Sequence, residues 1–452
     1  MAKVLISFLG IGRLVKGTPK REYEPATYKI GETEYRKSFV SLAIREHYNI
    51  DKLILIGTPR SMWEEVYNIY FHSNGEFDES IWTKIGEECA KKNHESKLEI
   101  PHKENIEQAM GGGSKVVLVR YGINAEEIRE NSEIILGLDT YLNEGDELYV
   151  DITNSFRSLP LYIMNLLIYL RDVSTKKVSI KGIYYGMLEA TKEVGHTPIV
   201  DLSEVLNVNS WISGAYSFME FGNAYKISSL IPKEYDNVSQ SLLKFSNTEN
   251  LNHLVALQEQ YANLKNLANN TDGWPLVMQK VIPQVVNKYI ETVTIDPKGD
   301  HITSDFQYKI AIWQQKRHNY LAAYSSLSEA VVTRCGELIL RYNVNNDIIN
   351  ETVKSYSFRE AVKEYLKNTL RYSGPNSQKN VLKKWAILWD NVKNTRNALV
   401  HAFEIQTTPK QLLDELKSAI KTYTNNRKCD SDYYSQTIYY EVVKLEDKQK
   451  NK

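Results

Sequence analysis

The sequence has few cysteines, no excess of charge of either sign and no long apolar run. Its three cysteines, Cys89, Cys335 and Cys429, are widely spaced and form no CxxC pair, so they indicate neither a disulfide framework nor a zinc site. We therefore expect a reduced, cytoplasmic protein. Because the run Val4–Leu9 is too short for a signal peptide and no window approaches about 18 uninterrupted apolar residues, we expect no membrane span.

The charges balance, with 56 Lys and Arg against 56 Asp and Glu. This balance excludes a strongly basic, sequence-independent nucleic-acid binder, so any contact with RNA must be local. There is no repeat at a fixed period and no low-complexity tract, and the length of 452 residues predicts two or three domains. The 30 tyrosines, interleaved with Lys and Arg in the C-terminal half, suit either base stacking or plain helix packing.

The first 200 residues alternate apolar runs with helical patterns. Continuous apolar runs separated by helices predict a Rossmann-like parallel sheet that is covered on both faces. We expect its strands at residues 3–9, 52–58, 115–120, 147–153 and 178–185, and helices at 35–48, from 61, at 125–142 and at 159–171.

Glycines, hydroxyls, amides and arginines follow these strands. Ligands bind beyond the carboxyl ends of parallel strands, and this mixture suits a ligand with phosphates and hydroxyls. The Gly10-Ile11-Gly12 turn lacks the third glycine of a dinucleotide fingerprint. The alternative is ordinary turn and cap chemistry, in which Ser61, Asp151 and Thr153 cap the helices that follow them.

The second half is helical. We expect helices at residues 203–229, 249–268, 275–292, 306–342, 358–370, 377–402 and 409–425, and a frayed tail at 444–452. In the 319–334 segment, Tyr320, Ala323, Leu327 and Ala330 form one apolar face, which should pack on Leu382, Trp385, Ala386 and Trp389. A loop at 293–303 divides a helical connector from this bundle. The predicted domains are therefore 1–202, 203–300 and 301–452.

The most informative stretch is Arg396-Asn397-Ala398-Leu399-Val400-His401, near the end of a long helical pattern. It places a fixed positive charge and a titratable imidazole within about 7.5 Å along a helix axis. The arginine suits phosphate oxygens, and the histidine can move the proton of a ribose hydroxyl. Alone, such a pair is more typical of a solvated arginine and a satisfied surface histidine.

Together with the N-terminal half, this motif gives the chain a family resemblance. The elements VLISFLGIG (4–12), DITNSFRSLP (151–160) and GIYYG (182–186) resemble motifs of a CARF sensor domain, and Arg-Asn-x3-His resembles the HEPN nuclease signature. In this order they resemble the CARF–HEPN ribonucleases, which are accessory effectors of type III CRISPR systems. The family often has His-Gly where this chain has Asn154-Ser155, which puts its ligand preference in doubt.

The resemblance implies an allosteric, metal-independent endoribonuclease that a cyclic oligoadenylate, most simply cyclic tetra-adenylate, activates without any required cofactor. It implies cleavage of single-stranded RNA to 2′,3′-cyclic phosphate and 5′-hydroxyl ends by a homodimer or higher assembly. The catalytic residues would be Arg396, Asn397 and His401, with no metal ligands. The residues implied for contact with the activator are Gly10, Arg13, Thr58, Arg60, Asn154, Ser155, Arg157 and Tyr185.

Geometry also bears on assembly. Helix positions five apart differ by roughly 140° in direction, so Arg396 and His401 diverge on an ideal helix while Asn397 and His401 align. A second chain would complete the pocket, or Thr395 could cap the helix and free Arg396. Three alternatives stay open: a non-catalytic regulator, a ring nuclease that cuts its own ligand through Thr58, Ser61 or Ser155, and a constitutive HEPN toxin.

Overall fold

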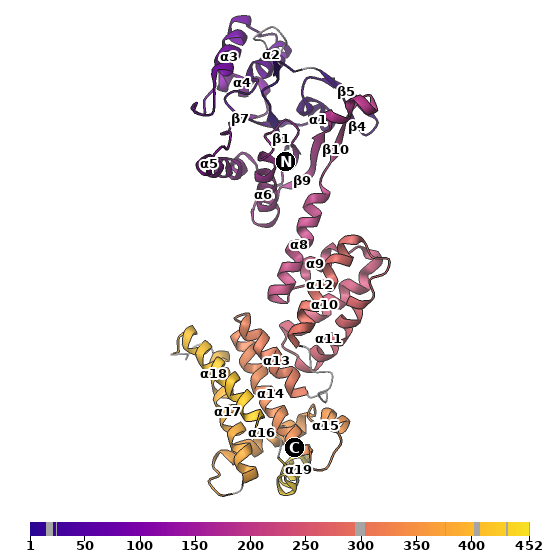
Figure 1. The fold of residues 1–452 in the computed structure, drawn as a ribbon, viewed down its shortest axis with the longest axis vertical. Helices are drawn as coiled ribbons and strands as arrows, with labels where there is room; N and C mark the ends of the chain where they lie inside the picture. Colours follow the sequence, from indigo (N-terminus) through magenta and orange to yellow (C-terminus); the bar gives the residue numbers. More distant parts are fainter. Residues whose placement is uncertain are drawn as a thin grey trace. The chain divides into compact units, whose positions relative to one another are not determined.

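The computed structural model describes residues 1–14, 21–23, 25–293, 303–375, 377–401, 407–430 and 433–451. The chain divides into two compact units, Met1–Val208 and Asn209–Lys452 (Figure 1). The first is an α/β unit and the second is helical, which confirms the predicted fold class. The predicted separation of 203–300 from 301–452 stays a prediction. No helix among the described residues is long and apolar enough to cross a membrane.

The first unit is built on a mixed sheet. Its strands are β1 Lys3–Leu9, β2 Arg13–Leu14, β3 Arg21–Glu22, β4 Ala26–Ile30, β5 Thr33–Lys37, β6 Lys52–Gly57, β7 Lys115–Leu118, β8 Glu147–Asp151, β9 Ser179–Gly186 and β10 Thr197–Asp201. The order is β5-β4-β10-β9-β8-β1-β6-β7, while β2 and β3 form a separate antiparallel pair. The five strands from β9 to β7 are parallel, as their apolar runs predict.

The sheet departs from the predicted parallel arrangement at one edge. There β10 runs antiparallel to β9, and the β4–β5 hairpin extends the sheet beyond it. The sequence reading missed these strands because they are short and partly polar, and because β10 begins Thr197-Pro198, where proline normally argues against a strand.

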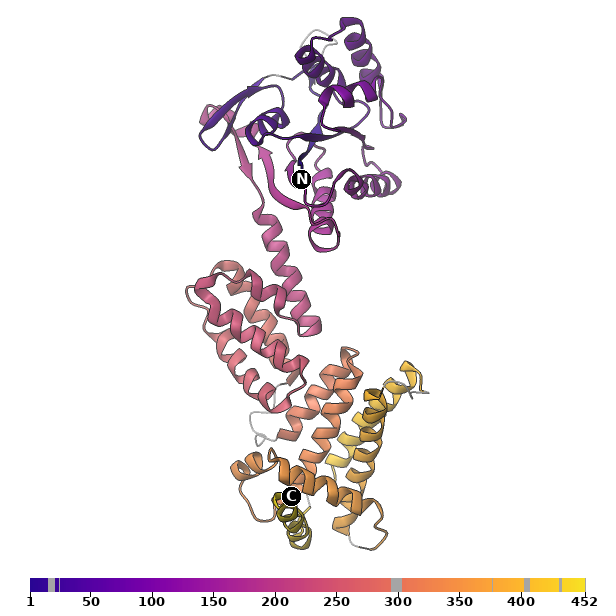
Figure 2. The same ribbon diagram turned by 180° about the vertical axis from the view of Figure 1, so that it is seen from behind.

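Helices cover both faces of this sheet, and Figure 2 shows the same layers from behind. Successive side chains of a strand point to opposite faces of the sheet, so the strand residues fall into two apolar clusters. One buries Leu5 and Leu55 under α1 to α4, and the other buries Ile6 and Ile56 under α5 and α6. The helices of this unit are α1 Val40–Tyr48, α2 Trp63–Asn74, α3 Glu79–Lys91, α4 Lys103–Met110, α5 Ala125–Leu136, α6 Leu159–Asp172 and α7 Thr191–Val194.

The second unit contains two apolar clusters. Helices α8 to α12, with part of α13, bury the first cluster, and α13 to α19 bury the second. The helices are α8 Glu204–Phe221, whose first residues belong to the first unit, α9 Tyr225–Leu230, α10 Asp236–Asn250, α11 Leu254–Asn269, α12 Leu276–Val293, α13 Thr303–Lys316, α14 Tyr320–Leu340, α15 Asn346–Thr352, α16 Tyr356–Leu370, α17 Ser377–Val400, α18 Pro409–Arg427 and α19 Gln436–Lys450.

The predicted packing of two helices is confirmed, since Ala323, Leu327 and Ala330 of α14 share a buried cluster with Leu382, Trp385, Ala386 and Trp389 of α17. Three of the predicted helices are interrupted. The helix expected at 203–229 breaks at Gly222, and those expected at 249–268 and 306–342 break at Asn252 and His318, all with positive φ. Asn252 and His318 are not glycines, so the sequence carried no strong break signal at those two positions. The tail predicted to fray forms α19 through Lys450.

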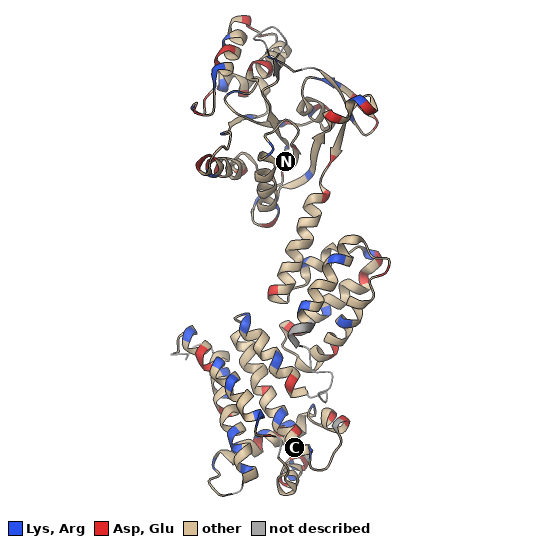
Figure 3. Cartoon of the chain, viewed as in Figure 1, with Lys and Arg blue, Asp and Glu red and all other residues tan. Residues whose placement is uncertain are grey.

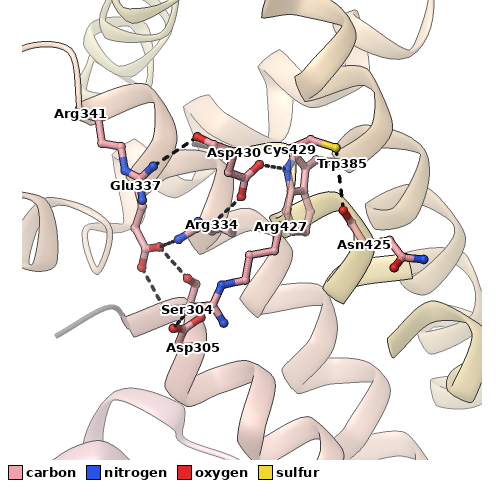
Figure 4. Close-up of polar contacts among 10 residues, drawn as sticks. All are labelled: Ser304, Asp305, Arg334, Glu337, Arg341, Trp385, Asn425, Arg427, Cys429 and Asp430. Atoms are coloured by element: carbon pink, nitrogen blue, oxygen red, sulfur yellow. Dashed lines mark hydrogen bonds and ion pairs between the residues drawn. The ribbon is translucent and has the colours of Figure 1, made fainter. Parts of the chain in front are cut away.

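Buried charges tie the bundle together (Figure 4). Arg334 of α14 donates from Nε to Asp430 Oδ2 at 2.8 Å, and its Nη1 lies 3.4 Å from Glu337 Oε2. Asp430 also accepts from Trp385 Nε1 of α17 at 3.0 Å. Glu337 accepts from the backbone N–H and hydroxyl of Ser304, so its carboxylate lies at the N-terminus of α13, where the helix dipole favours negative charge.

Candidate functional site

A pocket of about 160 Å³ lies at the carboxyl ends of the central strands of the first unit. Four of the eight residues predicted to bind the activator line it: Gly10, Thr58, Asn154 and Ser155. Its other lining residues include Ile11 and Phe156, which are 46% and 38% exposed. The pocket is therefore open, and it has both hydrogen-bonding groups and apolar surface.

The turn after β6 is held to the end of β1 by one hydroxyl. Ser61 Oγ donates to the carbonyl of Leu9 at 2.7 Å and accepts from the backbone N–H of Thr58 at 3.0 Å. Trp63 Nε1 donates to the Thr58 carbonyl at 2.9 Å. The suggestion that Ser61 caps the next helix is wrong, because α2 has Met62 at its N-cap without a side-chain bond. Thr58 and Ser61 are buried, so their hydroxyls shape the pocket rather than face a ligand freely.

A buried relay fixes the loop that carries Asn154 and Ser155. Asp151 accepts from Ser7 Oγ at 2.6 Å and from the backbone N–H of Thr153 at 2.9 Å. The Thr153 hydroxyl in turn accepts from the backbone N–H of Gly186 at 2.8 Å. Burial raises the pKa of Asp151, while these hydrogen bonds oppose the rise. The alternative in which Asp151 and Thr153 cap the following helix is wrong, since they link β1, β8 and β9.

Position 10 needs a glycine, because the Tyr23 side chain lies very close to its backbone. A Cβ at this position would lie 2.8 Å from the Tyr23 hydroxyl, closer than real Cβ contacts. Tyr23 packs edge-to-face on Phe39 at 4.6 Å, and burial raises its pKa. Sequence reasoning missed Tyr23, because it lies outside the strands and only the fold places its ring at the end of β1.

The remaining predicted contacts lie outside the pocket lining. Arg60 and Arg157 are exposed, and Tyr185 donates its hydroxyl to Glu189 Oε2 at 3.1 Å, which holds its ring at the end of β9. Arg13 lies in β2, and its side chain falls outside the described residues. Their role in ligand contact stays a prediction.

The nuclease motif lies at the end of α17. Asn397 and His401 are exposed, and Arg396 is half-buried. The Asn397 side-chain oxygen accepts from Arg396 Nε at 3.2 Å and from Nη2 at 2.9 Å, so this asparagine orients the guanidinium. The His401 N–H donates to the Asn397 carbonyl at 3.0 Å, which continues the helical turn. Thr395 lies inside α17 and does not cap it, so Arg396 is in the last turns of the helix.

Comparison with known proteins identifies the class of the first unit. A family model described as the CARF domain of the CRISPR system endoribonuclease Csx1 matches residues 4–189. A second model, described as the second domain of CRISPR-associated protein MJ1674, matches residues 207–296. Residues 4–189 thus form a CARF domain, which confirms that part of the resemblance.

One curated relative shares most of the chain. CRISPR-associated protein MJ1674 of Methanocaldococcus jannaschii is 34% identical over 419 residues, which cover 89% of this chain and 62% of the relative. The chain therefore spans 62% of the length of that relative. Among solved structures, Enterococcus italicus Csm6 bound to cyclic hexa-2′-fluoro-hexa-dAMP aligns over 100% of both chains, with 11% identity and a TM-score of 0.35. A likeness at that score carries nothing further about this chain.

Proposed function

We propose that this protein is an endoribonuclease that a cyclic oligoadenylate activates through the CARF domain. The observation that carries the proposal is the Arg396–Asn397–His401 group at the end of α17, with Asn397 and His401 exposed, on the same chain as a CARF domain with an open strand-end pocket. The substrate is single-stranded RNA, and the activator is most simply cyclic tetra-adenylate.

The pocket supports a two-fold assembly. Sites that enclose a small molecule usually measure roughly 300–1,000 Å³, so a pocket of about 160 Å³ holds only part of a cyclic tetranucleotide. A ring with two-fold symmetry would contact the same strand-end loops of two copies. Asn154 and Ser155 would meet its polar groups, while Arg60 and Arg157 would meet phosphates from the rim. Tyr185 offers a ring to adenine.

The chemistry follows from the side chains of the motif. His401 takes the proton of the ribose 2′-hydroxyl, or gives one to the 5′-oxygen that leaves, and such catalysis is worth roughly 10²–10⁴-fold in rate. Arg396, oriented by Asn397, stabilises the charge that develops on the phosphate oxygens. The 2′-oxygen attacks the adjacent phosphorus, which gives a 2′,3′-cyclic phosphate and a 5′-hydroxyl. DNA lacks this nucleophile and should resist cleavage.

The test is cleavage of a labelled RNA with and without cyclic tri-, tetra- and hexa-adenylate, in the presence of EDTA. We expect cleavage with one of these rings, and its loss in Arg396→Ala and His401→Ala. Lys384→Ala, which changes an exposed cation on the same helix, is the matched control. Intact RNA under every condition, or full activity in His401→Ala, would refute the proposal.

The dimer has its own test. If both His401 side chains serve one composite pocket, a mixed dimer of parent and His401→Ala chains should cut far less than half as fast as the parent dimer. Full activity per parent chain would exclude a shared pocket. Incubation of the protein with cyclic tetra-adenylate tests the ring-nuclease alternative, for which Ser155 is the best-placed hydroxyl because Thr58 and Ser61 are buried.

A further inference from the structure

Four tyrosines form a surface cluster in the helical unit that the Arg396–His401 motif does not use. The Tyr342 ring centroid lies 5.1 Å from that of Tyr434, 5.6 Å from Tyr439 and 6.4 Å from Tyr440. Tyr439 is half-buried and packs on the apolar core. Tyr434 and Tyr440 are 61% and 49% exposed, so much of each ring faces water. The cluster is thus anchored in the core by Tyr439 and exposes the rings of Tyr434 and Tyr440 to water.

The backbone beneath these rings is well fixed. The Tyr434 N–H donates to Gln378 Oε1, near the start of α17, at 3.2 Å. The Ser435 side chain caps α19 by accepting from the Ile438 N–H. Tyrosine itself loses little conformational freedom on binding, since only two torsions position its ring. The cluster is therefore a preformed aromatic surface.

The charges beside the cluster suit an anionic partner. Lys444 is exposed and lies one turn after Tyr440, on the same face of α19. Lys379 of α17 lies 3.3 Å from Glu441 Oε1 and 5.5 Å from the Tyr372 ring centre, so it compensates the carboxylate that follows Tyr440 in the sequence. Figure 3 shows that Lys and Arg are interspersed with Asp and Glu over this unit, so a nucleic-acid contact must be local. Open rings beside cations are what an unpaired nucleotide strand requires.

We propose that Tyr342, Tyr434 and Tyr440 form a stacking platform for bases of single-stranded RNA, with Lys444 at its phosphates, remote from the Arg396–His401 motif. This inference rests on the proposed function, because the strand on the platform is the substrate of that motif. The platform supplies affinity, and the motif supplies the chemistry.

Helix α17 runs from beside the platform to the motif. Polar residues of one face gather near its two ends, Lys379 and Lys383 beside the platform and Asn394, Asn397 and His401 at the motif, while the face between them holds the buried Ala386 and the acidic Asp390. From Gln378 to His401 the helix rises about 34 Å. A stacked strand, at about 3.4 Å per nucleotide, needs roughly ten nucleotides to cover that distance. The platform should therefore increase cleavage of long RNAs and leave cleavage of very short ones unchanged.

The experiment measures RNA binding without cleavage. Full-length His401→Ala protein is titrated into a fluorescein-labelled 20-nucleotide RNA, with and without the activating ring, and binding is followed by anisotropy. A Tyr434→Ala/Tyr440→Ala pair should weaken binding at least about fivefold, because each lost base stack is worth roughly five- to 150-fold. The matching Tyr→Phe pair keeps the rings and should bind like the parent.

The controls separate stacking from other causes. Tyr356→Ala removes a 79% exposed tyrosine at the start of α16 and should change nothing. With His401 intact, a five-nucleotide RNA is too short to reach from the platform to the motif, and the Ala pair and the parent should cleave it equally. The Ala pair should also keep the circular dichroism, melting temperature and oligomeric state of the parent.

Three outcomes overturn the inference. Equal binding of the 20-nucleotide RNA by a folded Ala pair excludes the platform. Equal loss in the Phe pair assigns the effect to hydroxyls rather than rings, and loss of the parent's oligomeric state makes the cluster a contact between copies. If active protein cleaves RNA while the Ala pair binds normally, only the platform is wrong. If the parent neither binds nor cleaves RNA, the proposed function is wrong as well.

Discussion

Asp430 should be one of the most costly side chains to remove from the helical unit. It is 1% exposed, and its two carboxylate oxygens accept from Arg334 of α14 and Trp385 of α17. Asp430→Ala leaves the Arg334 guanidinium with Glu337, 3.4 Å away, and leaves the indole N–H without its acceptor. Breaking a buried pair costs about 3–5 kcal/mol, and an orphaned donor accounts for about 1–3 kcal/mol of such a loss. We expect about 4 kcal/mol.

Hydrogen exchange with mass spectrometry measures this loss locally, which matters because a two-unit chain need not unfold in one step. Amides of α14 and α17 that exchange by opening of the bundle should exchange about 10³-fold faster, since each 1.4 kcal/mol is tenfold. Amides of the first unit should not change. Asp430→Asn keeps an acceptor for Trp385 and should cost less, about 1.5–3 kcal/mol.

A double-mutant cycle decides whether the charge pair is the cause. If it is, Arg334→Met combined with Asp430→Ala should be less destabilised than the sum of the two single variants. Additive effects, or unchanged protection in Asp430→Ala, would refute the reasoning.

Two further predictions concern stability. Burial raises the pKa of Glu249 to about 7, and Arg317 opposes the rise. The folded chain therefore holds a proton that the unfolded chain releases near the ordinary pKa of 4.5. The free energy of unfolding should fall between about pH 4.5 and 7, by at most about 3 kcal/mol. Glu249→Gln should remove that slope in urea titrations at pH 5 and 8, whereas the exposed Glu259→Gln on α11 should keep it; the same slope in both variants would contradict the assignment. Gly10→Ala should destabilise the first unit by about 1–3 kcal/mol through the Tyr23 hydroxyl, as judged by its melting temperature. In a Tyr23→Phe background the same change should be close to neutral, and an equal loss there would exclude this contact.

The sequence by itself determined the parts of the fold that depend on local pattern. The five apolar runs formed the parallel core of the sheet, and the apolar spacing of Ala323–Ala330 and Leu382–Trp389 identified two helices that pack together. Period two and period 3.6 are properties of the chain, so they can be read without coordinates. The six-residue Arg396–His401 motif was readable for the same reason, because its members lie on one helix.

Only the tertiary structure decided which residues meet across elements. The Ser7–Asp151–Thr153 relay joins two strands that are far apart in sequence, and Tyr23 reaches Gly10 from outside the sheet. Likewise, Tyr342 joins Tyr434 and Tyr440 only because α14 ends beside α19. Such contacts depend on how helices and strands are placed in three dimensions, which the local pattern of a single sequence does not specify.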